Sequence, residues 1–169
     1  MSKFTRCLKI AILEDNAERT VAMRAALADK LYMYEPHFLP TAPAMLAWLE
    51  QHAIEAIAIS LDHDLELPPL ETDRTDPGDG RMVADALARR QPTCPVIVHT
   101  TNVPAGDGME AVLCDAGWQT YRVTPCDDLL WIRQTWLPLL REAVFEAAKR
   151  RSTPTAFVAA ERYTSRGRK

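Results

Sequence analysis

Polar side chains follow three apolar runs of the sequence directly. In chain order they are Glu14 and Asp15, then Asp62, His63 and Asp64, then His99, Thr100, Thr101 and Asn102. Carboxylate oxygens are the ligands that Mg²⁺ and Mn²⁺ prefer, and a bound ion would offset the repulsion between the acids. Histidine can transfer protons near neutral pH. These residue types predict a divalent-metal centre that has proton-transfer groups beside it.

The elements that position these side chains are short apolar runs alternating with helical patterns. The runs that predict strands are residues 8–13, 37–39, 54–61, 95–99 and 120–123. Parallel strands need a covering helix at each crossover, so the alternation predicts a parallel α/β sheet with helices on both faces. Ligands of such sheets bind at the carboxyl ends of the strands, where the polar residues gather.

Five helices are expected between and after these strands. Thr41 and Asp79 are suited to cap the second and third. The last helix should run from Asp127 or Asp128 to about residue 150, with a kink at Pro138. The residues expected to pack inward are Ala17, Val21, Ala25 and Ala28 in the first helix, Met109, Val112, Leu113 and Ala116 in the fourth, and Leu130, Trp131, Trp136, Leu137, Leu140 and Val144 in the last.

Each polar residue also has a simpler explanation. Asp15 could do no more than cap the following helix. Because neighbouring strand residues face opposite ways, His63 could point away from the pocket, and only one of His99 and Thr100 need face it. Residues 65–80 contain three prolines and two glycines, which predicts a long loop of functional or mobile character.

Composition limits the class of protein. The chain has 169 residues, of which 47% are hydrophobic and 25% charged, a balance typical of one globular domain. Neither a membrane-spanning run nor a signal peptide is evident, so we expect a cytoplasmic protein that does not enter a membrane. The four cysteines are far apart in the sequence and are expected to be reduced, mostly buried thiols.

The charge is unevenly distributed along the chain. Residues 149–169 contain seven Lys or Arg against the single acid Glu161, a net charge of +6, so residues 1–148 carry −9 of the total of −3. This contrast predicts a globular domain at residues 1–150 and a basic tail at residues 151–169, which we interpret as a solvated terminus.

Four segments of the sequence resemble the receiver domain of two-component response regulators. They are ILED at 12–15, ISLD at 59–62, the glycine turn at 78–80 and PVIVHTTN at 95–102. The resemblance implies a doubly wound five-stranded parallel sheet of flavodoxin-like (β/α)5 type, with strand order 2-1-3-4-5. It also implies that Glu14 and Asp15 bind metal, that Asp62 is the phosphoacceptor and that Thr100 senses its state.

Departures from that pattern point to a divergent group of receivers. Thr124 occupies the place where receivers have a lysine, two residues after Arg122. The segments LDHDL and HTTN resemble the receivers for which processing of cyclic phosphates has been proposed. That resemblance implies catalytic roles for Asp62, His63, Asp64, His99 and Thr100, metal binding by Glu14, Asp15, Asp62 and Asp64 to Mg²⁺ or Mn²⁺, and a pocket completed by Thr101, Asn102 and Thr124.

Three functions are consistent with the sequence. The first is a metal-dependent hydrolase of a phosphate ester, for which a cyclic phosphate on a small molecule or an RNA end is the expected substrate. The second is a phosphoaccepting receiver that signals to a protein partner through Asp62. The third is a non-catalytic interaction module. By analogy with receivers, pairing of two copies through the last helix is also expected.

Overall fold

The computed structural model describes residues 7–66, 76–126 and 128–152. Five parallel strands form one sheet in the order β2-β1-β3-β4-β5, which confirms the predicted fold. The strands are β1 (Lys9–Leu13), β2 (Glu35–Leu39), β3 (Ala56–Leu61), β4 (Val96–His99) and β5 (Thr120–Val123). The helices are α1 (Ala17–Lys30), α2 (Ala42–His52), α3 (Gly80–Ala88), α4 (Val103–Asp115) and α5 (Leu137–Ser152), with a 3-10 turn at Ala53–Glu55 before β3.

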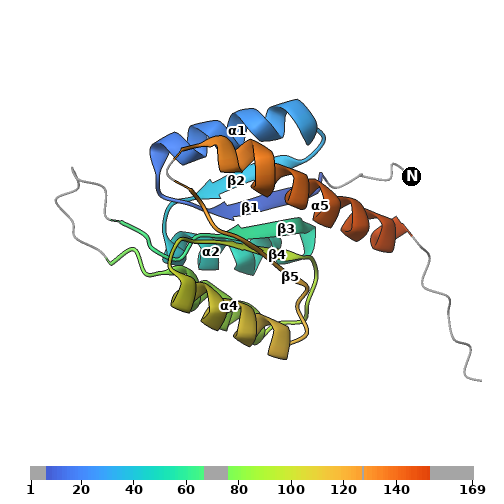
Figure 1. The fold of residues 1–169 in the computed structure, drawn as a ribbon. Helices are drawn as coiled ribbons and strands as arrows, with labels where there is room; N and C mark the ends of the chain where they lie inside the picture. The colour runs from blue at the N-terminus through green and yellow to red at the C-terminus, as the bar shows by residue number, and fades with distance from the viewer. Residues whose placement is uncertain (1–6, 67–75, 127, 153–169) are drawn as a thin grey trace, which may run out of the picture.

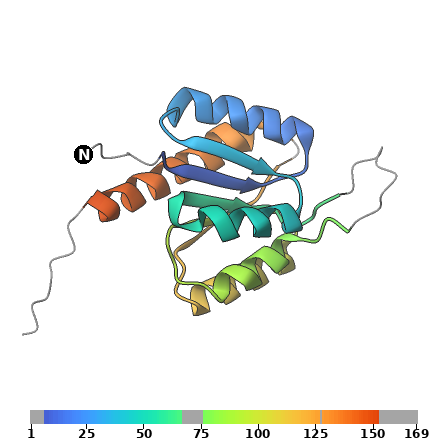
Figure 2. The same cartoon turned by 180° about the vertical axis from the view of Figure 1, so that it is seen from behind.

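Helices cover the sheet on both faces. In Figure 1, α1 and α5 lie on one face, and α2 and α4 lie on the other; Figure 2 shows the same layers from behind. Each face has its own buried apolar cluster, because alternate strand residues point to opposite sides. Ile12 and Ile97 pack under α1 and α5, whereas Leu13 and Val98 pack against α2, α3 and α4.

Side-chain caps fix the starts of four helices. The cap residues each accept a hydrogen bond from a backbone N–H in the first turn, which satisfies a donor that has no partner within the helix. They are Asn16 for α1, Thr41 for α2, Asp79 for α3 and Asn102 for α4. The predicted caps Thr41 and Asp79 are therefore confirmed, and α1, α3 and α4 begin close to the carboxyl edge of the sheet.

The predicted inner face of α1 is wrong. Its buried residues are Met23, Ala26 and Leu27, whereas the side chain of Val21 is 70% exposed. The predicted face was made mainly of alanines, which have little apolar surface to bury. Met23 and Leu27 have much more, so they determine which side of the helix packs on the sheet.

The last helical segment begins at Leu130, two residues after Asp128, and the Asp128 side chain accepts a hydrogen bond from the Leu130 N–H. Asp127, the other predicted start, lies outside the described residues. Leu130 is 55% exposed, which corrects its predicted place in the core. A π-helical segment, Ile132–Trp136, precedes α5 and Pro138. Trp131 and Trp136 are buried as predicted, and both belong to the cluster under α1 and α5.

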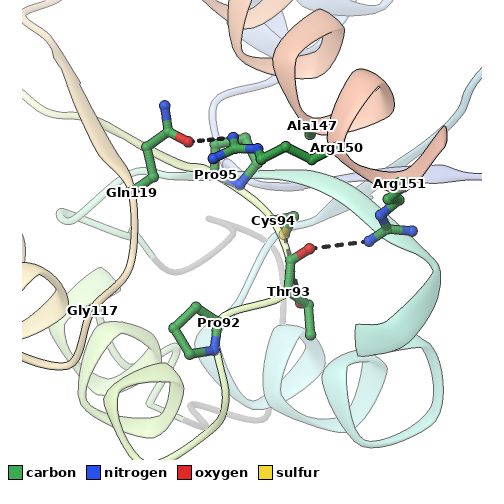
Figure 3. Close-up of a pocket in the computed structure, with 9 residues that line it drawn as sticks. All are labelled: Pro92, Thr93, Cys94, Pro95, Gly117, Gln119, Ala147, Arg150 and Arg151. Carbon is green, nitrogen blue, oxygen red and sulfur yellow. Dashed lines mark hydrogen bonds between the residues drawn. The ribbon is translucent and has the colours of Figure 1, made fainter. Parts of the chain in front are cut away.

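Three of the four cysteines are exposed, so the expectation of mostly buried thiols is wrong. Burial raises the pKa of the remaining thiol, Cys94, to about 12. Cys94 lines a cavity of about 280 Å³ at the amino ends of β4 and β5, together with Arg150 and Arg151 of α5 (Figure 3). Arg151 donates hydrogen bonds to the backbone carbonyls of Ile54, Ala56 and Thr93, which ties the end of α5 to this edge of the sheet.

Parts of two predicted segments lie outside the described residues. Residues 64–66 and 76–79 are irregular, as predicted for the loop at 65–80, but residues 67–75 are not described. Helix α5 continues to Ser152, and residues 153–169 are not described either, so the division at residue 150 stays a prediction. In the described part of the chain, every helix is too short or too polar to span a membrane.

Candidate functional site

Two carboxylates and one imidazole meet at the carboxyl edge of the central strands. Glu14 follows β1, Asp62 follows β3, and His99 ends β4. Ligand atoms of the three side chains lie within 4.8 Å of one another, and the residues are only 2%, 2% and 0% exposed. Nε2 of His99 lies 3.3 Å from Oε2 of Glu14. This is the arrangement of a small, buried, negatively charged centre.

Strand alternation explains why these three residues converge. Glu14 is two residues after Ile12, and His99 is two residues after Ile97; both isoleucines pack under α1 and α5. A spacing of two keeps side chains on the same face of a strand. The centre therefore lies on the α1 and α5 side of the sheet edge, and His99 faces it. The sequence alone had left open whether His99 or Thr100 would do so.

Asp62 is the most perturbed acid of the centre. Its Oδ1 accepts a hydrogen bond of 2.7 Å from the His63 N–H, and its Oδ2 lies 3.1 Å from Nη1 of Arg19. Burial raises the pKa of Asp62, and the Glu14 charge adds to that effect, while a positive charge on His99 and that of Arg19 oppose it. The net direction is upward, so the carboxylate is held in an environment that disfavours its charge and favours an added cation.

Arg19 is a member of the site that the sequence interpretation missed. It lies in the first turn of α1, and its Nη1 is 3.1 Å from Asp62 Oδ2 and 3.4 Å from Glu14 Oε2. One guanidinium nitrogen thus bridges the two carboxylates. The available signal was its place five residues after Glu14, in the helix that the acid pair introduces, where a long cationic side chain can reach back to the sheet edge.

Two buried side chains, those of Ser60 and Trp131, contact the His99 imidazole directly. Its Nδ1 is 2.9 Å from Ser60 Oγ, and Ser60 Oγ accepts a 3.0 Å hydrogen bond from Nε1 of Trp136. Trp131 stacks on the imidazole with ring centroids 6.1 Å apart. Ser60, Trp131 and Trp136 were not among the predicted site residues, since a serine within an apolar strand carries no sequence signal of its own.

His63 and Asp64 lie beside the centre without joining it. Asp64 has a 58% exposed side chain, which contacts Nε2 of His63 at 3.7 Å and accepts a 3.4 Å hydrogen bond from Asn102. Nδ1 of His63 is buried and makes no hydrogen bond with the described residues. The His63 backbone is fixed more firmly, because its carbonyl accepts a 3.0 Å bond from the N–H of Gly80 in α3.

The other predicted residues lie outside this cluster. Asp15 is outside the cluster and accepts a 2.5 Å bond from the Glu66 N–H. Thr100 is buried and accepts a bond from the Asn102 N–H, whereas Thr101 and Thr124 are exposed. The structure thus brings together Glu14, Asp62 and His99, while metal binding by Asp15 and Asp64 stays a prediction.

The donor set of the centre suits a divalent cation. Two buried carboxylates supply hard oxygen ligands, and the raised pKa of Asp62 records the uncompensated charge that a cation would neutralise. Arg19 already contributes one positive charge to the same two acids. A metal ion would therefore have to share Glu14 and Asp62 with Arg19, or displace it.

Removing Arg19 is expected to strengthen metal binding. Arg19→Met eliminates a cation that competes for both carboxylates, so we expect Mn²⁺ affinity, measured by calorimetry, to rise about tenfold, or about 1.4 kcal/mol. Arg24→Met is the matched control, since Arg24 lies on the same helix with its guanidinium over the Phe38 ring. An affinity that is unchanged or lower in Arg19→Met would show that Arg19 supports the metal site instead.

Comparison with solved structures finds receivers of response regulators. The phosphorylated cyanobacterial phytochrome response regulator RcpA is 21% identical, with a TM-score of 0.61 over 82% of this chain and 94% of that one. The response regulator domain of Thermotoga maritima CheB is 19% identical, with a TM-score of 0.57 over 85% and 98% of the two chains. The Mn²⁺-bound form of response regulator Rcp1 is 20% identical, with a TM-score of 0.54 over 77% and 94%.

The matches to solved structures establish the fold, whereas the family is shown by the sequence. A search of curated proteins gave no match. The family model of the cyclic-phosphate processing receiver domain, in contrast, matches residues 9–115, which is more than half of the chain and extends from β1 to the end of α4. The matched region includes Glu14, Asp62 and His99. The chain therefore belongs to the cyclic-phosphate processing receiver domain family.

Proposed function

We propose that this receiver domain binds Mg²⁺ or Mn²⁺ at Glu14 and Asp62 and hydrolyses a phosphate ester, with cyclic phosphates as the substrate class. The observation that carries the proposal is the buried cluster in which two carboxylates and the His99 imidazole lie within 4.8 Å. Membership of the family supports the substrate class, and the likeness to Mn²⁺-bound Rcp1 supports the choice of metal.

Each group in the site has a proposed role. Glu14 and Asp62 would hold the metal, and Asp15 and Asp64, at the rim, are the remaining candidates for ligands or for binding its water shell. A bound divalent ion would supply charge neutralisation for the phosphoryl oxygens. Arg19 adds a second positive charge beside Asp62, which compensates for Thr124 in the place of the receiver lysine.

Opening a cyclic phosphate requires two proton transfers. Water attacks phosphorus and loses a proton, one P–O bond of the ring breaks, and the departing oxygen gains a proton to become a hydroxyl. His63 and His99 are the proposed proton carriers. Nδ1 of His63 lacks a partner among the described residues, so it is free to accept a proton, while His99 faces the acids directly. Thr101 and Asn102 are placed at the rim where the substrate would lie, and the buried Thr100 hydroxyl accepts a hydrogen bond from the Asn102 N–H.

A substrate screen tests the proposal. Purified protein is incubated with Mg²⁺ or Mn²⁺ and 2′,3′-cyclic nucleotides, 3′,5′-cyclic nucleotides or an RNA with a 2′,3′-cyclic end, and products are followed by ³¹P NMR. We expect turnover with at least one, and a loss of at least about 10³-fold in Asp62→Asn, since Asp62 is both ligand and charge partner. Asp85→Asn, an exposed acid paired with Arg81, is the matched control. Absence of turnover on every substrate would overturn the proposal.

A phosphoaccepting receiver is the second candidate. It is supported by the position of Asp62 directly after β3, by the buried Thr100 that directly follows the neighbouring strand β4, and by the likeness to phosphorylated RcpA. Incubation with a small phosphodonor and Mg²⁺, followed by intact mass, separates the two: a stable phosphoryl adduct that is absent in Asp62→Asn favours this function. If the protein shows no turnover, no phosphoryl adduct and no response to metal, it would be an interaction module. The binding site for its signalling partner, or for a second copy, would then be sought on α5.

A further inference from the structure

A buried chain of hydrogen bonds connects the last helical segment with the acidic centre. Nε1 of Trp136 is 3.0 Å from Ser60 Oγ, Ser60 Oγ is 2.9 Å from Nδ1 of His99, and Nε2 of His99 is 3.3 Å from Oε2 of Glu14. Trp136, Ser60 and His99 are fully buried, and Glu14 is 2% exposed. Solvent therefore cannot supply alternative partners, and the four groups must satisfy one another.

The two end groups, Trp136 and Glu14, set the donor-to-acceptor direction of this series of hydrogen bonds. An indole nitrogen can only donate, and an ionised carboxylate can only accept. Because the Trp136 N–H donates to Ser60 Oγ, the hydroxyl proton of Ser60 is best used by donating to His99 Nδ1. In a neutral imidazole the other nitrogen then carries the proton, so Nε2–H points at the acceptor Glu14. Every donor in this arrangement meets an acceptor.

We infer that Trp136 and Ser60 are positioning residues that fix neutral His99 as its Nε2–H tautomer. The inference deepens the proposed function, on which its significance rests. In this tautomer His99 presents a proton donor to the centre and not the free nitrogen lone pair that a metal ligand needs. The metal would then be held by carboxylates alone, which favours hard cations such as Mg²⁺ and Mn²⁺.

The π-helical segment explains how one helix supplies both tryptophans of the site. Trp131 stacks on His99, and Trp136, five residues later, donates to Ser60. In a regular α-helix, residues five apart differ by about 140° around the axis. In the π-helical segment Ile132–Trp136, by contrast, backbone hydrogen bonds join residues five apart, such as the bond from the Leu137 N–H to the Ile132 carbonyl. This wider turn brings the two indoles to the same side of the helix.

The tautomer can be measured directly by ¹⁵N NMR of the histidine ring in metal-free protein. We expect wild-type His99 to carry its proton on Nε2. In Trp136→Phe the directing donor is lost, so the Nδ1–H form should become populated, and Co²⁺ affinity should rise about tenfold as the Nε2 lone pair becomes available, with Mg²⁺ affinity changed less than about twofold. Trp118→Phe is the matched control, because Trp118 is a buried indole that donates to the Leu87 carbonyl in the other core cluster.

Several results would overturn the inference. These are a wild-type ring protonated on Nδ1 or on both nitrogens, or a Trp136→Phe variant that keeps the wild-type tautomer and metal preference. Should Trp136→Phe fail to fold, Trp136→Met provides the second variant, since it also removes the indole donor while leaving Ser60 Oγ to accept from Nδ1, and it should give the same redistribution. The tautomer is read without metal or substrate, so its failure leaves the proposed hydrolysis standing, whereas wild-type protein that binds no metal refutes only the proposed function.

Discussion

Asp62→Asn is expected to be more stable than the wild type at neutral pH in the absence of metal, by about 1–2 kcal/mol in urea unfolding. Asp62 is 2% exposed, and its burial together with the Glu14 charge outweighs the help of His99 and Arg19, since the net direction of its pKa is upward. Asparagine removes the buried charge and keeps a carbonyl oxygen that can accept from the His63 N–H.

The pH dependence follows from the same shift. Because the folded pKa of Asp62 lies above the unfolded value of 3.8, the folded state holds the proton more tightly. Its contribution to stability is therefore greatest below pH 3.8 and falls as the pH rises through the folded pKa. The difference in the free energy of unfolding between Asp62→Asn and the wild type should therefore increase as the pH rises through that window and disappear on acidification.

Adding metal should invert the order of the two proteins. Mn²⁺ at about 100 times its dissociation constant would stabilise the wild type by about 2.7 kcal/mol, and Asp62→Asn much less, because a ligand has been lost. Asp85→Asn is the control for both conditions, since Asp85 lies outside the acidic centre, on α3, and its side chain is exposed and paired with Arg81. If metal-free Asp62→Asn proves less stable than wild type at neutral pH, the Arg19 pair, and not burial, dominates at this position.

The strands were predictable from sequence because their apolar runs are short, β-branched and bounded by polar residues. Residues 120–123 coincide with β5, and the run at 54–61 exceeds β3 only where the 3-10 turn at Ala53–Glu55 replaces extended chain. The helix faces were less predictable. Val21 and Leu130 have the apolar character of core residues, yet tertiary packing leaves both exposed, and spacing alone does not distinguish them from Met23.

The acids of the site were predictable, but their partners were not. Glu14 and Asp62 end strands, and parallel strands bring their carboxyl ends together. The orientation of His99 follows from its spacing of two from the buried Ile97, an argument available from sequence once the buried face is known. Arg19, Ser60 and Trp136 reach the site from a helix, a strand interior and the π-helical segment, and these contacts depend on three-dimensional packing that no local pattern encodes.

Among substitutions that add one methyl group to the site, Gly80→Ala is expected to be the most damaging. A Cβ at Gly80 would lie 2.1 Å from the Asp62 carbonyl oxygen and 2.9 Å from the His63 Cα. These are backbone atoms, held by the 3.0 Å bond from the Gly80 N–H to the His63 carbonyl, so α3 and the end of β3 must move apart. We expect a loss of about 2–3 kcal/mol in urea unfolding, because overpacking against backbone cannot be relieved by a rotamer change.

The same substitution should weaken Mn²⁺ binding by more than about tenfold, since the displaced segment carries Asp62 itself. Gly108→Ala distinguishes this effect from a general cost of losing glycine. Gly108 lies inside α4, where a Cβ would meet only the end of the exposed Arg81 side chain, at 2.9 Å. Alanine there should leave metal binding unchanged and raise stability by up to about 1 kcal/mol through helix propensity. Equal effects of the two substitutions would mean that the contact of α3 with Asp62 and His63 does not hold the carboxylate in place.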